Sequence, residues 1–251
     1  MTSRKKSNHR FMRTMIVVLA ITGAFALGAS VAGEDSPALI TTTTATTETT
    51  NLEAIMHATI DKITKANVYI RIRTLEDEIR AGSAAVIYQD DDSYYAITNF
   101  HVVTDVGSAI EATVMTSDGV VSSFEILDSS IGEELALIAF PKADRSAIEP
   151  LRIGTESFFD VDDTVIAIGN PLGAIGSITV GKITDFVLIR QLELEYDTIA
   201  HDAAIAAGSS GGALVDLHGN LLGINTWSLD GVMYAIRFES IQSFIAHHEL
   251  Q

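Results

Sequence analysis

Short apolar runs separated by turn residues recur from residue 67 almost to the end of the chain. They are rich in Val, Ile, Ala and Tyr and mostly too short for helices, which is typical of β-strands. So many strands at close spacing favour barrels or sandwiches over strands that alternate with helices. The clearest runs are VYIRIRT, GSAAVIY, YYAITN, AIEATVMT, VSSFEIL, LALIAF, TVIAIGN, SITVGKI, TIAHD, GALVDL, LLGINTW and VMYAI.

The acidic, proline-containing stretch 142–163 divides these strands into two similar sets. We therefore expect an all-β domain over 52–251, with two antiparallel barrels over about 67–150 and 160–236 and a cleft between them. Two flanking segments have helical spacing instead. A leading helix capped by Asn51 is predicted by the spacing of Leu52, Ile55, Met56, Ile60 and Ile63. A C-terminal helix over about 238–249 is predicted by SIQSFIAHHEL.

The first 51 residues have a different character. A basic head, an apolar run over 15–27 and the small residues Ser30-Val31-Ala32 fit an export signal over 1–32. Extended over 14–32, the apolar segment reaches the lower length limit of a membrane span, so a cleaved signal and an uncleaved anchor both remain open. The Thr-rich residues 33–51 predict a disordered linker. The remainder is expected to be extracytoplasmic, either secreted or associated with the cell envelope.

The charge balance excludes several partners. Asp and Glu number 33 against 16 Lys and Arg, and five of these basic residues lie within the first 13 positions. A surface this negative repels nucleic acid and anionic lipid, so we expect the folded domain to bind neither. The chain has no cysteine, which excludes disulfides and thiolate metal sites, and its histidines lack a ligand spacing. We expect neither a metal nor another cofactor.

Candidate chemistry lies in GSSGG and in two of the seven histidines, His101 and His201. The others fall in the export signal, in a predicted helix, in a His-Gly-Asn turn or near the C-terminus. Taken alone, GSSGG also fits the G-x-S-x-G elbow of α/β-hydrolases, with Ser210 as the nucleophile. That elbow requires a helix after the serine, whereas GALVDLHGNLLGIN predicts a hairpin. The elbow interpretation therefore fails.

Several segments together resemble the trypsin-like fold and, within it, the HtrA (Deg) family of exported serine proteases. GSAAVIY and YYAITNFHVV resemble that family's first strands and its histidine motif, and TVIAIGNPLG followed by SITVGKI resembles its middle strands. HDAAIAAGSSGGALVDLHGNLLGIN resembles its nucleophile block, and VMYAIRFESIQSFI its closing strand and helix. The resemblance covers about 81–249 in the right order. It implies the chymotrypsin fold, with two six-stranded antiparallel β-barrels.

The resemblance assigns His101 as the general base and Ser210 as the nucleophile. A serine hydroxyl attacks a peptide carbonyl at neutral pH only when a base removes its proton. The negatively charged oxygen that forms is then held by backbone N–H groups, and a side chain at position 208 would obstruct that approach. The residues expected to form this oxyanion hole are Gly208, Ser209 and Ser210.

The third member of the triad departs from the family pattern. Glu134 stands in GEELALIAF where the family has an aspartate. Its carboxylate lies one methylene farther from the backbone, so it can orient the histidine only if the backbone or the ring shifts. Asp128 is an alternative acid if the loop itself has shifted.

Specificity is predicted from the position six residues before the nucleophile. A preference for Lys or Arg would need an acid there, but the residue is Ala204. We therefore expect a small or medium aliphatic side chain at the cleaved position, as the resemblance also implies. His201, where the family usually has threonine, is expected to be structural or at the surface. The residues expected to contact substrate are Ala204, Ile205 and Thr226.

The sequence thus predicts an exported serine endopeptidase of HtrA type, without the PDZ domain that commonly follows, acting on unfolded or misfolded polypeptides. The alternative is a pseudoprotease that keeps the double barrel as a protein-binding or chaperone-like module. The Glu134 substitution motivates the alternative, and the retention of His101, Gly208 and Ser210 argues against it. A homo-oligomer, specifically a trimer, is implied by the resemblance alone.

Overall fold

The computed structural model describes residues 43–248, apart from 105, 144–146, 156–158 and 192. The predicted signal or anchor over 1–32 therefore lies outside the described residues. Within the described part, no helix combines the length and the apolar character that crossing a membrane requires.

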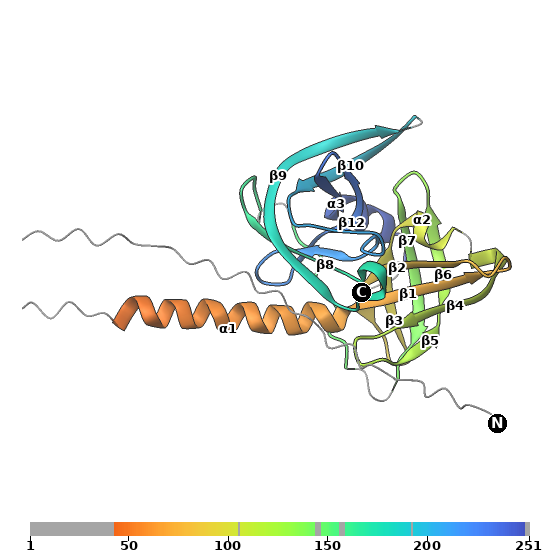
Figure 1. Ribbon diagram of the computed structural model, residues 1–251, viewed down its shortest axis with the longest axis horizontal. Coiled ribbons are helices and arrows are strands. Elements are labelled where there is room, and N and C mark those ends of the chain that lie inside the picture. The colour runs from red at the N-terminus through yellow and green to blue at the C-terminus, as the bar shows by residue number, and fades with distance from the viewer. Residues whose placement is uncertain (1–42, 105, 144–146, 156–158, 192, 249–251) are drawn as a thin grey trace, which may run out of the picture.

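The leading helix, α1 (Thr43–Ala66), extends away from the body of the molecule (Figure 1). Its C-terminal turns are anchored: Ile63 and Ala66 are fully buried, and the Thr59 hydroxyl donates a hydrogen bond to the Leu217 carbonyl oxygen (2.9 Å). The prediction of a linker to residue 51, with Asn51 as the cap, is wrong for residues 43–51, which are helical. Once packed turns supply the nucleus, each further turn costs little, even for threonines of modest helix propensity.

The first half of the chain forms one antiparallel sheet, which we call the first sheet, in the order β5-β4-β1-β2-β3-β7-β6. It has seven strands, although six were expected. The predicted run VSSFEIL is interrupted at Phe124, giving β5 and β6 on opposite edges of the sheet. Because one residue joins these edge strands, the sheet must curl until its edges meet. The strands are β1 (Asn67–Thr74), β2 (Ile79–Gln89), β3 (Ser93–Thr98), β4 (Ala109–Met115), β5 (Val121–Ser123), β6 (Glu125–Ser130) and β7 (Leu135–Pro141).

The second half forms a closed barrel of six strands, which we call the second barrel, in the order β10-β13-β12-β11-β8-β9. The predicted all-β, trypsin-like fold is confirmed, with two curled sheets packed side by side (Figure 1). A closing helix, α3 (Phe238–Ile245), buries Phe238, Ile241 and Phe244. The barrel strands are β8 (Thr164–Gly169), β9 (Ser177–Gln191), β10 (Leu194–His201), β11 (Ala213–Val215), β12 (Leu221–Leu229) and β13 (Val232–Arg237).

One apolar core runs through both halves. The inward-facing residues of β1, Val68, Ile70 and Ile72, are at most 1% exposed, and they belong to the same cluster of buried side chains as Ile166 and Ile224 of the second barrel. Burial of alternate residues along β1 is the period expected of a strand with one covered face. The two halves are therefore held together by continuous apolar packing.

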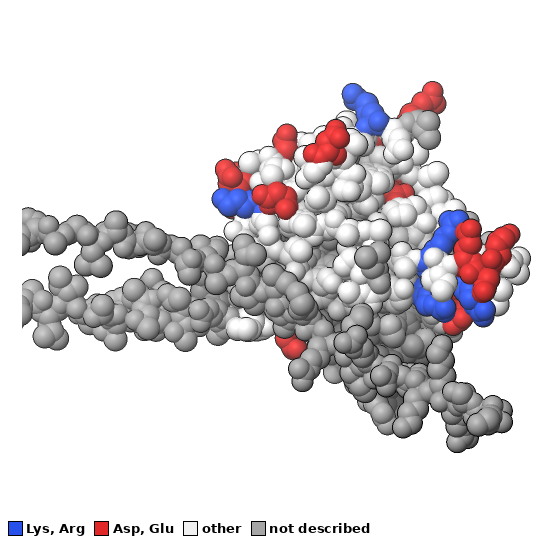
Figure 2. Space-filling view, in the orientation of Figure 1, with Lys and Arg blue, Asp and Glu red and all other residues white. Residues whose placement is uncertain are grey.

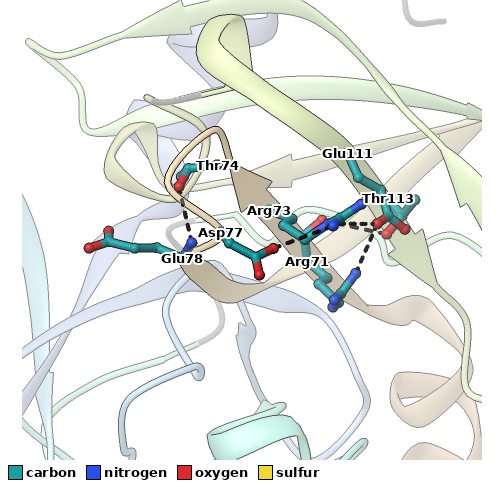
Figure 3. A network of polar contacts seen from close by, with 7 residues as sticks. All are labelled: Arg71, Arg73, Thr74, Asp77, Glu78, Glu111 and Thr113. Atoms are coloured by element: carbon teal, nitrogen blue, oxygen red, sulfur yellow. Dashed lines mark hydrogen bonds and ion pairs between the residues drawn. The ribbon is translucent and has the colours of Figure 1, made fainter.

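Charged side chains lie at the periphery. Figure 2 shows mainly acidic residues, with some basic ones among them, over the second barrel and a compact group of acidic and basic residues at the far end of the first sheet. Figure 3 shows the members of that group: Arg71 and Arg73 of β1 contact Glu111 of β4 (3.3 and 3.4 Å), and Arg73 also contacts Asp77 in the β1–β2 turn (3.3 Å). Partly exposed pairs of this kind contribute little stability individually. They tie the hairpin to its neighbouring strand.

Candidate active site

His101 is presented by a single helical turn at the end of β3. Asn99 precedes this turn, α2 (Phe100–Val103), and Val102 and Val103 are buried beneath it. The His101 side chain is 45% exposed. The turn is thus anchored by its apolar residues, and the imidazole is left accessible.

Glu134 lies directly before β7, and its side chain is 7% exposed. Its Oε1 is hydrogen-bonded to Nδ1 of His101. A carboxylate only accepts, so Nδ1 carries the proton and Nε2 of the neutral ring is free to act as a base. The Glu134 backbone has φ of +57°, a left-handed conformation that is unfavourable for a residue with a Cβ. The extra methylene of glutamate is therefore accompanied by an unusual backbone conformation.

Asp128, the alternative acid, is engaged elsewhere. Its Oδ2 lies 3.0 Å from Nε2 of His248, beyond α3. The structure therefore brings Glu134, and not Asp128, to His101.

Ser210 lies in a sequence of two tight turns. Ser209 N–H donates to Ala206 O (2.8 Å), with Gly208 at φ +97°, the third position of the turn, where a type II turn needs a positive φ. Gly212 N–H donates to Ser209 O (2.9 Å), with Gly211 at φ +85°. A Cβ at Gly211 would lie 2.0 Å from the Ser83 carbonyl oxygen. Conformation therefore favours glycine at both positions, and lack of space also requires it at position 211.

The first sheet supports this loop through Ser83 of β2. Ser83 N–H donates to Ser210 O (2.8 Å), and the Ser83 hydroxyl donates to Gly208 O (2.8 Å). The same hydroxyl accepts from the backbone N–H and the side-chain amide of Asn170 (2.9 and 3.0 Å). Sequence reasoning assigned no role to Ser83 or Asn170. The only available signal was their place in GSAAVIY and AIGNPLG, the segments that carry the resemblance.

The histidine turn and the serine loop meet at Gly82. A Cβ there would lie 2.5 Å from Cγ1 of Val102, the neighbour of His101, and 3.3 Å from Ser210 O. Both segments therefore pack on the same point of β2.

The Ser210 hydroxyl donates to the carbonyl oxygen of Thr226 (3.1 Å). The pairing of β12 with β13 shifts between Asn225 and Trp227, so Thr226 lies at a bulge, a device that redirects backbone groups next to active sites. Within the described ranges, neither Gly208 N–H nor Ser210 N–H donates to a protein acceptor. Of the three residues predicted for the oxyanion hole, Gly208 and Ser210 therefore have available N–H donors, whereas the N–H of Ser209 is used in the turn.

The residues predicted to contact substrate lie beside this loop. Ala204 is exposed, and its carbonyl oxygen accepts from the Thr179 hydroxyl (2.8 Å). Ile205 is half-buried against the apolar interior of the second barrel, and Thr226 is 5% exposed. None of these three positions carries a charge that would attract Lys or Arg.

His201, at the end of β10, is fully buried and not at the surface. Burial lowers the pKa of His201 to about 4, so the ring is neutral near pH 7. The Asn225 side chain, the Asp202 charge and the Ala203 backbone each favour the charged form of the ring, against the effect of burial. His201 belongs to the barrel interior, separate from His101.

A histidine–carboxylate pair on one curled sheet and a serine in a glycine turn on a second define a trypsin-like peptidase domain. The family comparison agrees, since the sequence model of the trypsin-like peptidase domain matches residues 82–224, and the chain belongs to this family. Within the family, the predicted HtrA type is confirmed by the relatives and solved structures that the chain resembles.

Two curated relatives illustrate the extent of the similarity. A probable serine protease do-like of Buchnera aphidicola is 36% identical over 154 residues, which cover 60% of this chain and 30% of the relative. Serine protease HTRA1 of Xenopus tropicalis is 30% identical over 198 residues, covering 74% and 41%. The chain thus spans less than half the length of these relatives.

Solved structures match the fold. The HtrA-type protease AlgW with a tripeptide superposes with a TM-score of 0.63 at 30% identity, covering 78% of this chain and 64% of that one. The serine endoprotease from Yersinia pestis gives a TM-score of 0.62 at 27% identity, with coverage of 76% and 65%.

Proposed function

We propose that this chain is a serine endopeptidase that uses Ser210 as nucleophile, His101 as general base and Glu134 as the acid that orients the base. The observation that carries the proposal is the buried Glu134 carboxylate on Nδ1 of His101, because it fixes the tautomer in which Nε2 can accept a proton.

The reaction begins when the Ser210 hydroxyl turns from Thr226 O toward Nε2 of His101. As Nε2 takes the proton, Oγ bonds to the peptide carbonyl carbon, and the resulting oxyanion accepts from Gly208 N–H and Ser210 N–H. Nε2 then gives its proton to the amine nitrogen while the C–N bond breaks. A water molecule, deprotonated by the same nitrogen, hydrolyses the acyl ester and restores the serine.

The substrates we propose are unfolded or misfolded polypeptides with a small or medium aliphatic residue before the cleaved bond. Ala204, Ile205 and Thr226 support this specificity, since they offer apolar surface and no countercharge. We place the reaction outside the cytoplasm, supported by the export pattern of residues 1–32 and by relatives named periplasmic endoproteases.

Covalent labelling of the purified full-length chain with a fluorophosphonate probe tests the proposal. We expect the wild type to label and Ser210→Ala to remain unlabelled. Glu134→Gln should slow labelling by about 10⁴-fold, the loss of kcat when the orienting acid of a related triad is replaced by its amide. The matched control is Asp128→Asn, which removes a nearby carboxylate bound to His248 and should label at the wild-type rate.

Two outcomes would contradict the proposal at different points. Absence of labelling in the wild type would contradict enzymatic activity and favour the pseudoprotease. Slow labelling of Asp128→Asn with normal labelling of Glu134→Gln would leave the enzyme intact and overturn the assignment of its acid.

A further inference from the structure

The turn that carries Glu134 is poorly held by its own side chains. Residues 131–134 form a turn before β7, in which Gly132 contributes no side chain and Ile131 is 58% exposed. Glu134 itself has the left-handed backbone described above, a conformation that persists only when its surroundings enforce it. Contacts from outside the turn must therefore supply the constraint.

Two such contacts come from the first sheet, where the Asn99 side-chain amide donates to Glu134 O (3.2 Å) and Glu133 N–H donates to the Ser130 hydroxyl (3.2 Å). A third comes from the second barrel. Tyr196 of β10 is 6% exposed, and its hydroxyl donates to Ile131 O (3.1 Å), at the start of the turn. The acid of one half is thus restrained by a side chain of the other.

Tyr196 is itself braced by an aromatic neighbour. Its ring packs edge-on against Trp227, with centroids 5.0 Å apart and planes at 62°. Trp227 directly follows Thr226, whose carbonyl oxygen accepts from the Ser210 hydroxyl. The contacts therefore run from the acid turn through two aromatic rings to the strand segment that contacts the nucleophile.

We propose that Tyr196, braced by Trp227, is a positioning residue that holds the 131–134 turn where the Glu134 carboxylate meets His101. The inference rests on the proposed serine peptidase activity. Its physical basis is that glutamate has one more rotatable bond than aspartate, so its carboxylate stays on Nδ1 only if the turn is fixed at both ends.

The electrostatics of the tyrosine suit this role. Burial raises the pKa of Tyr196 above its usual value of 10.0, and the negative charge of Glu134 raises it further. The phenol is therefore protonated throughout the physiological range and remains a donor to Ile131 O.

Tyr196→Phe tests the proposal, because it keeps the ring and removes a single hydroxyl. With a fluorophosphonate as probe, we expect the limiting rate of inactivation to fall about 10–100-fold, the scale for a catalytic group displaced by a fraction of an ångström to 1 Å. The concentration giving half of that limiting rate should stay within about twofold, since no contact with the probe is lost. In a Glu134→Gln background the same change should have no further effect.

Tyr94→Phe is the matched control. Tyr94 is also a buried tyrosine whose oxygen is hydrogen-bonded to a backbone group, Ile148 N–H (3.2 Å), but it lies at the opposite end of β3 from His101. We expect it to lower the melting temperature comparably to Tyr196→Phe and to leave the labelling rate unchanged.

The outcomes separate this inference from the function on which it rests. A wild type that does not react with the probe overturns both. A reactive wild type with an unaltered Tyr196→Phe rate overturns the positioning role alone, as does an equal loss of rate in the Glu134→Gln background.

Discussion

Replacing Ser83 by alanine tests the support of the nucleophile loop. The change removes one hydroxyl that makes three hydrogen bonds, to Gly208 O, Asn170 N–H and the Asn170 side-chain amide. The side-chain amide keeps its bond to Val68 O (3.1 Å). Asn170 is fully buried and its backbone N–H keeps no acceptor among the described residues, whereas Gly208 is half-buried and within reach of water.

The expected loss of stability is the sum of two effects, one at Asn170 N–H and one at Gly208 O. A buried N–H left without an acceptor costs about 1–3 kcal/mol, and the exchange of one ordinary hydrogen bond for water about 0.5–1.5 kcal/mol. We therefore expect Ser83→Ala to lower the free energy of unfolding by about 2–4 kcal/mol. For a domain of this size, that corresponds to a melting temperature about 5–15 °C lower.

A second effect is kinetic. The lost bond holds Gly208, whose N–H we propose as a donor to the developing oxyanion, and complete removal of such a donor costs about 10²–10³-fold in rate. Because the donor here is loosened and not removed, we expect a decrease of about tenfold in fluorophosphonate labelling at a temperature where the variant is folded.

Thermal unfolding and labelling of the same preparations provide the measurements. Ser123→Ala, an exposed serine on β5, is the matched control and should change neither quantity. A Ser83→Ala melting temperature within about 1 °C of wild type, with normal labelling, would show that β2 does not support the loop and would refute the reasoning.

The remaining predictions concern the close packing of Gly169 against the serine loop and the pH dependence of stability. A Cβ at Gly169 would lie 2.7 Å from Cα of Ser209, so Gly169→Ala should displace the loop, slow labelling and cost about 1–3 kcal/mol, while Gly107→Ala, with open space, should do neither. The folded-state pKa of His201 is about 4 and its unfolded value about 6.5, so the unfolded chain binds the extra proton between them. The free energy of unfolding should therefore be about 3 kcal/mol higher above pH 6.5 than below pH 4, because of His201. This difference should be lost as the pH falls from 6.5 to about 4, with no further change below that. Urea unfolding of wild type and His201→Thr across this range checks it, because equal pH dependence in both would exclude His201 as the source.

The strands of both halves were predictable because burial on one face leaves a period of two in the sequence. The number of strands in the first sheet was not predictable. VSSFEIL has a continuous strand pattern, although its two parts pair with strands on opposite edges of the sheet. The helical start of α1 was missed for a related reason. Threonine-rich residues carry no periodic signal, and the helix is nucleated by contacts farther along the chain.

The candidate site also contains residues that the sequence predicted and residues that it did not. His101, Glu134 and Ser210 lie in short motifs, so their residue types and order were enough to select them. The residues that hold the serine loop and the Glu134 turn could not be found from such motifs. Ser83 is 125 positions from Gly208 in sequence, and Tyr196 is 65 positions from Ile131. His201 has the same residue type as the base, and only its burial in the barrel separates the two.

The dependence of the Ser210 loop on β2 has a consequence for how the molecule is made. During synthesis the strand with Ser83 and the segments with His101 and Glu134 emerge well before the serine. The serine loop, in turn, gains the hydrogen bonds from Ser83 only when the second barrel docks on the first sheet. A fully synthesised chain whose two halves have not docked therefore holds His101, Glu134 and Ser210 without their arrangement. We expect its reactivity to arise when the second barrel docks on the first sheet.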